Sequence, residues 1–187
     1  MRKIVMFNRV SVDGFFAGPN GEIDWHVMDP QVDAAIHQMM APDTILFGRV
    51  TYQMFESFWP HVTDDPGASP GFRALADELN QMTKIVFSTT LESVTWVNSR
   101  LMHGDVVGEA QRLKAGTGGD MVIFGSGTIA QQLAATGLID EHILAITPVL
   151  LGAGKPMFKG GEKTVLRLLE SSAFPTGNVV QHYAVEN

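Results

Sequence analysis

Three short segments of the sequence combine residue types that bind phosphate groups. They are Phe47-Gly48-Arg49-Val50-Thr51, Phe87-Ser88-Thr89-Thr90 and Phe124-Gly125-Ser126-Gly127-Thr128. Each follows an apolar run, and two of them precede a helix-like pattern, where unpaired backbone N–H groups and the helix dipole favour an anion. Gly48 and Gly125 lack a Cβ and allow the backbone to approach a ligand closely, while Arg49 adds a guanidinium with a geometry that matches phosphate. These segments therefore predict a site for a phosphorylated dinucleotide.

The order of the apolar and amphipathic segments indicates how these turns come together. Strands are predicted at residues 3–8, 44–47, 84–88, 121–124 and 142–151, with a short one at 94–97. Helices are predicted at residues 30–40, 49–58, 72–81, 109–115 and 126–135. Continuously apolar strands that alternate with helices are typical of a parallel sheet covered on both faces. Because the carboxyl ends of parallel strands share one edge, where ligands bind in open α/β folds, the three turns should meet there.

The C-terminal residues add a different pattern to this sheet. Segments 164–171 and 178–185 are joined through residues 174–177 and are predicted to form a closing antiparallel pair. The expected fold class is therefore three-layer α/β, with a mostly parallel sheet and antiparallel C-terminal edge strands. We expect residues 1–187 to form one domain, because the length suits a single core and no linker interrupts the pattern.

The last glycine turn also fits the Rossmann fingerprint G-x-G-x-x-A, from Gly125 to Ala130. Two features count against a Rossmann fold. The motif begins late in the chain, and the next strand has no acidic residue at its end to bind a ribose hydroxyl.

Composition excludes several other classes of function. The chain carries a formal net charge of −7, so a polynucleotide would repel it. It has no cysteine, which excludes disulfides and thiolate nucleophiles. Its six histidines show no His-x-His or His-Glu-x-x-His spacing, so no metal site is expected. No apolar stretch reaches the roughly 18 residues of a membrane span. We therefore expect a cytoplasmic protein that binds neither nucleic acid nor a membrane.

Taken in order along the chain, these motifs resemble the dihydrofolate reductase-like superfamily, in particular the RibD C-terminal domain family of riboflavin biosynthesis reductases. The resemblance covers nearly the whole chain. It rests on Ser11-Val12-Asp13-Gly14, Asp24-Trp25, Leu46-Phe47-Gly48-Arg49-Val50-Thr51-Tyr52, Lys84-Ile85-Val86-Phe87-Ser88, Gly125-Ser126-Gly127 and Leu150-Leu151-Gly152-Ala153-Gly154.

The resemblance implies an NADPH-dependent reductase that transfers hydride to a small heterocyclic or carbonyl substrate. Carried over by position, Arg49 and Thr51 with Gly48 would meet the cofactor phosphates, and Ser88 and Thr89 would lie near the adenosine end. The pyrophosphate side would be held by Gly125, Ser126, Gly127 and Thr128. The resemblance further implies that Leu151, Gly152 and Gly154 line the far side of a substrate pocket and that the protein is a homodimer.

The catalytic residues are less well defined by the sequence. Asp13 is the first candidate for a polar group at the reacting centre and Asp33 the second, although Asp13 equally suits a turn before Gly14. Trp25 is either a stacking wall for substrate or an anchor in the core. The resemblance leaves two substrates open, a pterin or 5-amino-6-(5-phosphoribosylamino)uracil, and Arg9 and Lys155 are the candidate cations for a ribose phosphate. The alternative function is a non-catalytic protein that binds NADP(H) or another small ligand and acts in regulation.

Overall fold

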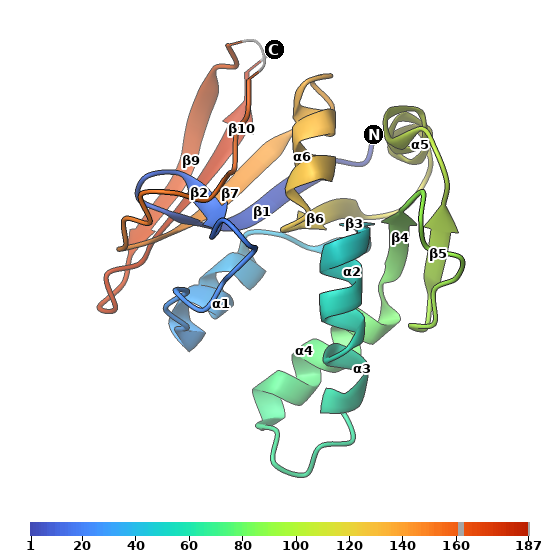
Figure 1. Ribbon diagram of the computed structural model, residues 1–187, viewed down its shortest axis with the longest axis horizontal. Helices are drawn as coiled ribbons and strands as arrows, with labels where there is room; N and C mark the ends of the chain where they lie inside the picture. The colour runs from blue at the N-terminus through green and yellow to red at the C-terminus, as the bar shows by residue number, and fades with distance from the viewer. Residues whose placement is uncertain (161–162, 187) are drawn as a thin grey trace.

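An eight-stranded sheet organises the computed structural model, which describes residues 1–160 and 163–186 (Figure 1). The strands are β1 Ile4–Ser11, β2 Phe15–Ala17, β3 Pro42–Gly48, β4 Thr83–Phe87, β5 Ser99–Met102, β6 Asp120–Phe124, β7 Glu141–Thr147, β8 Lys155–Pro156, β9 Leu166–Ala173 and β10 Val179–Val185. The helices are α1 Pro30–Gln38, α2 Arg49–Glu56, α3 Trp59–Val62, α4 Pro70–Gln81, α5 Val106–Ala115 and α6 Gly127–Ala134. The sheet order is β5-β4-β3-β6-β1-β7-β10-β9, and β2 pairs separately with β8.

The direction of the strands confirms the predicted fold class. From β5 to β7 all neighbouring strands run parallel, whereas β10 is antiparallel to both β7 and β9. The turn between β9 and β10 is closed by hydrogen bonds between Phe174 and Asn178 and between Gly177 and Phe174. The parallel part of the sheet therefore has one carboxyl edge, formed by the ends of β3, β4 and β6.

Helices cover both faces of the sheet, which gives three layers. On one face α5 and α6 pack on alternate side chains of the central strands, among them Met6, Ile85 and Ile123. On the other face α2 and α4 pack over β3 and β4, and α1 packs over β1, β7 and β10. None of the described helices is both long enough and apolar enough to span a lipid bilayer.

Helix α1 begins as its sequence predicts. The Asp29 carboxylate accepts a hydrogen bond from the N–H of Gln31 at 2.8 Å, and Pro30 occupies the first helical position, where no intrahelical N–H bond is lost. The Thr176 hydroxyl also donates to Asp29, at 2.7 Å. Asp29 is thus committed to the helix start and to the turn between β9 and β10.

Two of the strand predictions are wrong, one in its existence and one in its end. Residues 94–97 are not a strand, because the N–H of Trp96 donates to Tyr52 and Glu56 instead of to a neighbouring strand, and the edge strand is β5, just beyond. The strand predicted at 142–151 ends at Thr147, because Pro148 has no N–H to continue the ladder. The segment between the predicted strand at 3–8 and the predicted helix at 30–40 contains the short strand β2.

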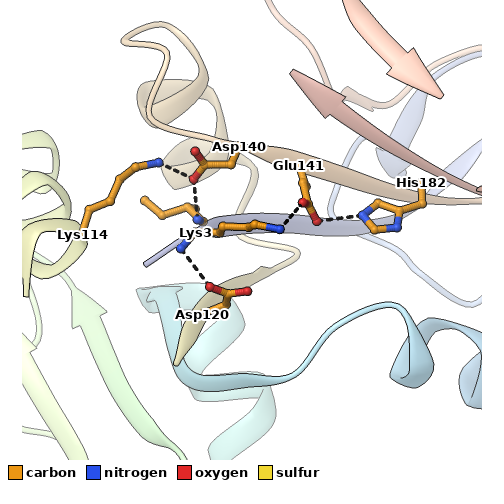
Figure 2. A network of polar contacts seen from close by, with 7 residues as sticks. Lys3, Lys114, Asp120, Asp140, Glu141 and His182 are labelled. Atoms are coloured by element: carbon orange, nitrogen blue, oxygen red, sulfur yellow. Dashed lines mark hydrogen bonds and ion pairs between the residues drawn. The ribbon is translucent and has the colours of Figure 1, made fainter. Parts of the chain in front are cut away.

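The amino-terminal edge of the sheet is held by a network of ion pairs (Figure 2). The Lys3 ammonium lies 2.7 Å from one oxygen of Glu141, and His182 Nε2 lies 2.9 Å from the other. Beside it, Asp140 accepts from the N–H of Ile4 at 2.8 Å and pairs with Lys114. These contacts join β1, β7, β10 and α5 at the edge opposite the predicted cofactor turns.

Replacing Glu141 with glutamine should lower the free energy of unfolding near neutral pH by about 1 kcal/mol. Burial acts to raise the pKa of Glu141, but hydrogen bonds from Lys3 and His182 outweigh it and leave the pKa below its ordinary 4.5. The contribution of this carboxylate is therefore present above pH 4.5 and is lost as the pH falls through the folded-state pKa. Urea unfolding at pH 7 and pH 3.5 measures the difference. It should shrink at the lower pH, while Glu92→Gln, at an exposed loop position, should have no effect at either.

Candidate active site

A cleft of about 1000 Å³ opens at the carboxyl edge of the parallel strands. Its walls come from the middle of β1, from the ends of β3, β4 and β6 with the turns that follow them, and from α1, α2, α3 and α4. All nine residues predicted to bind a cofactor line this one cleft: Gly48, Arg49, Thr51, Ser88, Thr89, Gly125, Ser126, Gly127 and Thr128. The parallel sheet brings these residues together from segments that are far apart in the sequence.

Side-chain hydrogen bonds fasten the first and third of these turns to one another. The Ser126 hydroxyl accepts from the N–H of Gly48 at 3.0 Å, and the N–H of Ser126 donates to the Thr51 hydroxyl at 3.1 Å. Gly125 and Ser126 both have left-handed backbone conformations, with φ of 58° and 45°, and a left-handed serine is uncommon. The Asn8 amide donates to the carbonyl of Gly125 at 3.2 Å and supports this turn from β1. The two turns therefore form one preorganised unit.

The ends of α2 and α6 at this unit fit an anionic group. In the described part of the chain, no side chain caps the N-terminus of either helix. The N–H groups of the first turn therefore do not bind a capping side chain in place of a ligand. Arg49 is the first residue of α2 and is exposed, with Nη1 3.3 Å from the Gln53 amide oxygen. Gly127 begins α6, and a Cβ there would lie 2.4 Å from the Phe16 ring. A side chain at Gly127 would therefore require the Phe16 ring to move.

The second turn lies beside the other two but is organised by its own contacts. The Ser88 hydroxyl accepts from the N–H groups of Thr90 and Leu91 at 3.1 and 3.0 Å, and its carbonyl lies 2.8 Å from His103 Nδ1. Thr89 is exposed at the tip of the turn. The contacts of Ser88 therefore hold the turn that forms this wall of the cleft, and Thr89 is an exposed residue on that wall.

Asp13 and the predicted substrate-pocket residues do not lie on the cleft wall. The Asp13 carboxylate accepts from the N–H groups of Leu151 and Gly152, at 3.1 and 2.7 Å, and so holds the loop after β7. A hydrogen bond from Ser11 and these backbone bonds keep the pKa of Asp13 below its usual value. Gly154 lies against β2, since a Cβ there would meet the Ala17 carbonyl at 2.4 Å. These contacts give the four residues a role in joining β1, β2 and β8.

Trp25 does not line the cleft but packs against a residue that does. Its ring packs edge to face against His26 at 4.4 Å, and its Nε1 donates to the Glu22 carbonyl at 3.0 Å. His26 itself lines the cleft. Burial, with a smaller contribution from the charge of Arg9, lowers the pKa of His26 to about 4, so the ring is neutral at physiological pH.

Of the acidic residues predicted for catalysis, Asp33 is the one that lines the cleft. It pairs with Arg9, which projects from β1 and whose side chain is 10% exposed. Burial raises the pKa of Asp33, and the Arg9 charge opposes this only in part. Arg9 Nη1 is buried without a hydrogen-bond partner among the described residues. The pair thus places a carboxyl of raised pKa and a guanidinium side by side at the cleft.

A second part of the cleft, which we name the apolar arm, lies between α1 on one side and α2, α3 and α4 on the other. Its apolar walls are formed by Ile36, Met40, Met54, Phe55, Trp59, Phe72, Leu75, Leu79 and Met82. The sequence did not predict this arm, because methionines at apolar helix positions are typical of core residues. The signal available in the sequence was the aromatic spacing Phe55, Phe58, Trp59 in one short stretch.

Comparison with known proteins agrees with these observations. The model of the RibD C-terminal domain family matches residues 2–180. The uncharacterized protein YyaP of Bacillus subtilis (strain 168) is 31% identical over 188 residues, covering 97% of this chain and 95% of that protein. A second protein of that organism, YwjB, is 28% identical over 97% of each chain.

Solved structures share the fold. A protein named for riboflavin biosynthesis from Shewanella sp. PV-4 superposes with a TM-score of 0.72 at 22% identity, over 99% of both chains. Dihydrofolate reductase from Enterococcus faecalis, complexed with NADP(H), superposes with a TM-score of 0.63 at 15% identity, over 99% of this chain and 97% of that one. The sequence motifs, the sheet order and the family match lead to one conclusion: this chain belongs to the RibD C-terminal domain family.

Proposed function

We propose that the protein is an NADPH-dependent reductase that transfers hydride to a small heterocyclic or carbonyl substrate. One observation carries the proposal: all nine residues predicted for the cofactor line a single cleft that continues into the apolar arm. The cofactor pyrophosphate would lie at the fastened turns around Gly48 and Ser126, and Arg49 beside them would contact the 2′-phosphate of NADPH. A reduced nicotinamide, when bound, supplies the hydride.

The residues of the chain then position the reactants and keep water from them. The turn Gly125-Ser126-Gly127 is rigid because Thr51 and Asn8 bind it, and a rigid site holds a reacting group in place at little entropic cost. Phe7 in the middle of β1 and Phe124 at the end of β6, with ring centroids 6.0 Å apart, line the cleft side by side. Such an apolar wall excludes water from a hydride transfer.

Reduction of a carbonyl or imine also needs one proton, and Asp33 is the group that we propose holds it. Its raised pKa increases the protonated fraction near neutral pH, and it lines the cleft. Asp13, whose pKa is lowered and whose oxygens bind backbone N–H groups, is poorly suited to donate a proton. Arg9 holds the Asp33 carboxyl in position.

The experiment has two stages. NADPH is first titrated into the protein and binding is followed by quenching of tryptophan fluorescence. Its oxidation is then measured by absorbance with pterins, ribosylaminouracils and quinones as acceptors. We expect binding in the micromolar range and turnover with at least one acceptor class, reduced at least tenfold by Asp33→Asn. No binding at millimolar NADPH would overturn the proposal, and binding without turnover of any acceptor would favour the regulatory alternative.

We also propose that the protein is a homodimer. Leucines of β9 at the sheet edge are unusually exposed, with Leu168 at 52% and Leu169 at 41%, and a second copy would cover such a surface. Sedimentation equilibrium should give a dimer, and Leu168→Lys should shift it toward monomer by at least tenfold in dissociation constant. A monomeric wild-type protein at high micromolar concentration would contradict this proposal.

A further inference from the structure

The apolar arm is lined mainly by apolar and aromatic side chains, which do not match the polarity of a phosphorylated sugar. It continues directly from the cofactor turns, and its walls carry aromatic rings in a row. Phe55 lies 6.2 Å from Trp59, and Trp59 lies 5.1 Å from Phe72, between ring centroids. Phe72 is 39% exposed and Met54 is 45% exposed. Exposed aromatic and methionine side chains in a concave site favour a flat apolar ligand that covers them.

The charges around the arm argue against a phosphate there. Asp33 and Glu78 contribute carboxylates from α1 and α4. His37 Nδ1 lies 3.7 Å from the Glu78 carboxylate, where α1 and α4 approach each other. Arg9 is already paired with Asp33. Arg49 belongs to the cofactor turns. Of the described residues that line the arm itself, Arg9 is the fixed cation and already has an acidic partner, while Glu78 adds a negative charge that would repel a phosphate dianion.

Lys155 does not alter this balance. It lines the cleft from the β2–β8 pair, outside the helices that form the arm, and its ammonium approaches Gly21. The pKa of Glu22 is lowered by a hydrogen bond from Asn20 and, to a smaller extent, by the charge of Lys155. The ammonium thus has a carboxylate near it as well.

We infer that the apolar arm binds an uncharged, extended aromatic heterocycle bearing a carbonyl group, and that it rejects the phosphoribosyl form of such a ring. This inference rests on the proposed function, whose substrate it specifies. The ring lies against Phe72 and Trp59. Its carbonyl accepts a hydrogen bond from the Arg9–Asp33 pair, where Arg9 Nη1 has an unused N–H.

Three isoalloxazines that differ in one substituent provide the test. Lumiflavin is neutral, whereas FMN carries the same ring with a ribityl phosphate, and riboflavin carries the ribityl chain alone. Each is titrated into the protein with saturating NADP⁺ present, so that the cofactor turns are covered, and flavin fluorescence is followed. We expect lumiflavin to bind at least tenfold more tightly than FMN, with riboflavin close to lumiflavin, because the phosphate is the group rejected.

Paired variants place the ligand in the arm. Phe72→Ala should weaken lumiflavin binding at least fivefold, because it removes one aromatic wall. Phe158→Ala makes the same change at a side chain that is 54% exposed and outside the cleft, and should leave binding unchanged. Thermal unfolding checks that both variants are folded.

Several outcomes overturn the inference: FMN binding as tightly as lumiflavin, no detectable lumiflavin binding, displacement of lumiflavin by NADP⁺, or equal effects of the two variants. None of these readouts depends on turnover. A protein that binds lumiflavin as expected but fails to bind or oxidise NADPH would contradict the proposed function and leave the arm's preference standing. The reverse result would contradict the preference alone.

Discussion

Replacing Arg49 with alanine should weaken NADPH binding roughly ten- to a hundredfold and change NADH binding less than twofold. Arg49 is the first residue of α2, is exposed, and lines the cleft beside the fastened turns. A charge-assisted bond from a guanidinium to a phosphate contributes about 1.5–3 kcal/mol, which corresponds to this range. NADH lacks the 2′-phosphate, so removal of the guanidinium should change its affinity little. Fluorescence titration with both nucleotides measures the two affinities.

Two further variants separate a specific contact from a general change of charge. Arg112→Ala removes the same charge from an arginine on α5 that is 62% exposed and pairs with Glu109, so it should leave both affinities unchanged. Arg49→Lys should recover only part of the loss, because an ammonium cannot form the paired bonds of a guanidinium. If Arg49→Ala weakens NADPH and NADH equally, the residue does not contact the 2′-phosphate.

The sequence sufficed to predict where the cofactor turns meet, and the reason is physical. Parallel strands place all their carboxyl ends at one edge, so a glycine or serine after each strand is located once the strand is recognised. Gly48 ends β3, and Ser88 and Gly125 directly follow β4 and β6. The local sequence pattern therefore decides where the three turns meet, and the packing of the helices on the sheet does not change it.

The same reasoning could not decide where Asp13 points. Gly14, with φ of 84°, turns the chain after β1 and aims the carboxylate at N–H groups on a loop 138 residues away. The partner of a polar side chain is set by tertiary structure, which no local pattern contains. Leu151 and Gly152, predicted to line a substrate pocket, are the residues whose backbone N–H groups donate to Asp13.

Lys84 is the clearest example of a residue whose environment cannot be predicted from the neighbouring sequence. It begins an apolar run and would be expected to reach solvent, yet its side chain is fully buried. The ammonium donates to the carbonyls of Asn80 and Val97, at 2.9 and 3.0 Å, and lies 4.4 Å from the centroid of the Trp96 ring. It therefore joins the last turn of α4 to the loop before β5. Burial lowers the pKa of Lys84 to about 8, from an ordinary 10.5.

This buried amine should make the protein more stable as the pH rises from 8 to 10.5. Across that window the unfolded chain binds a proton that the folded chain has released, so the free energy of unfolding increases with pH, by about 1–3 kcal/mol. The carbonyl acceptors and the Trp96 ring favour the ammonium and keep the gain toward the lower end. Urea unfolding at pH 7.5, 9 and 10.5 measures it. Lys84→Met keeps the volume and should abolish the rise, while Lys159→Met, at an exposed position, should retain it. A rise of the same size in both variants would mean that other groups titrate, and that Lys84 is held equally well in either protonation state.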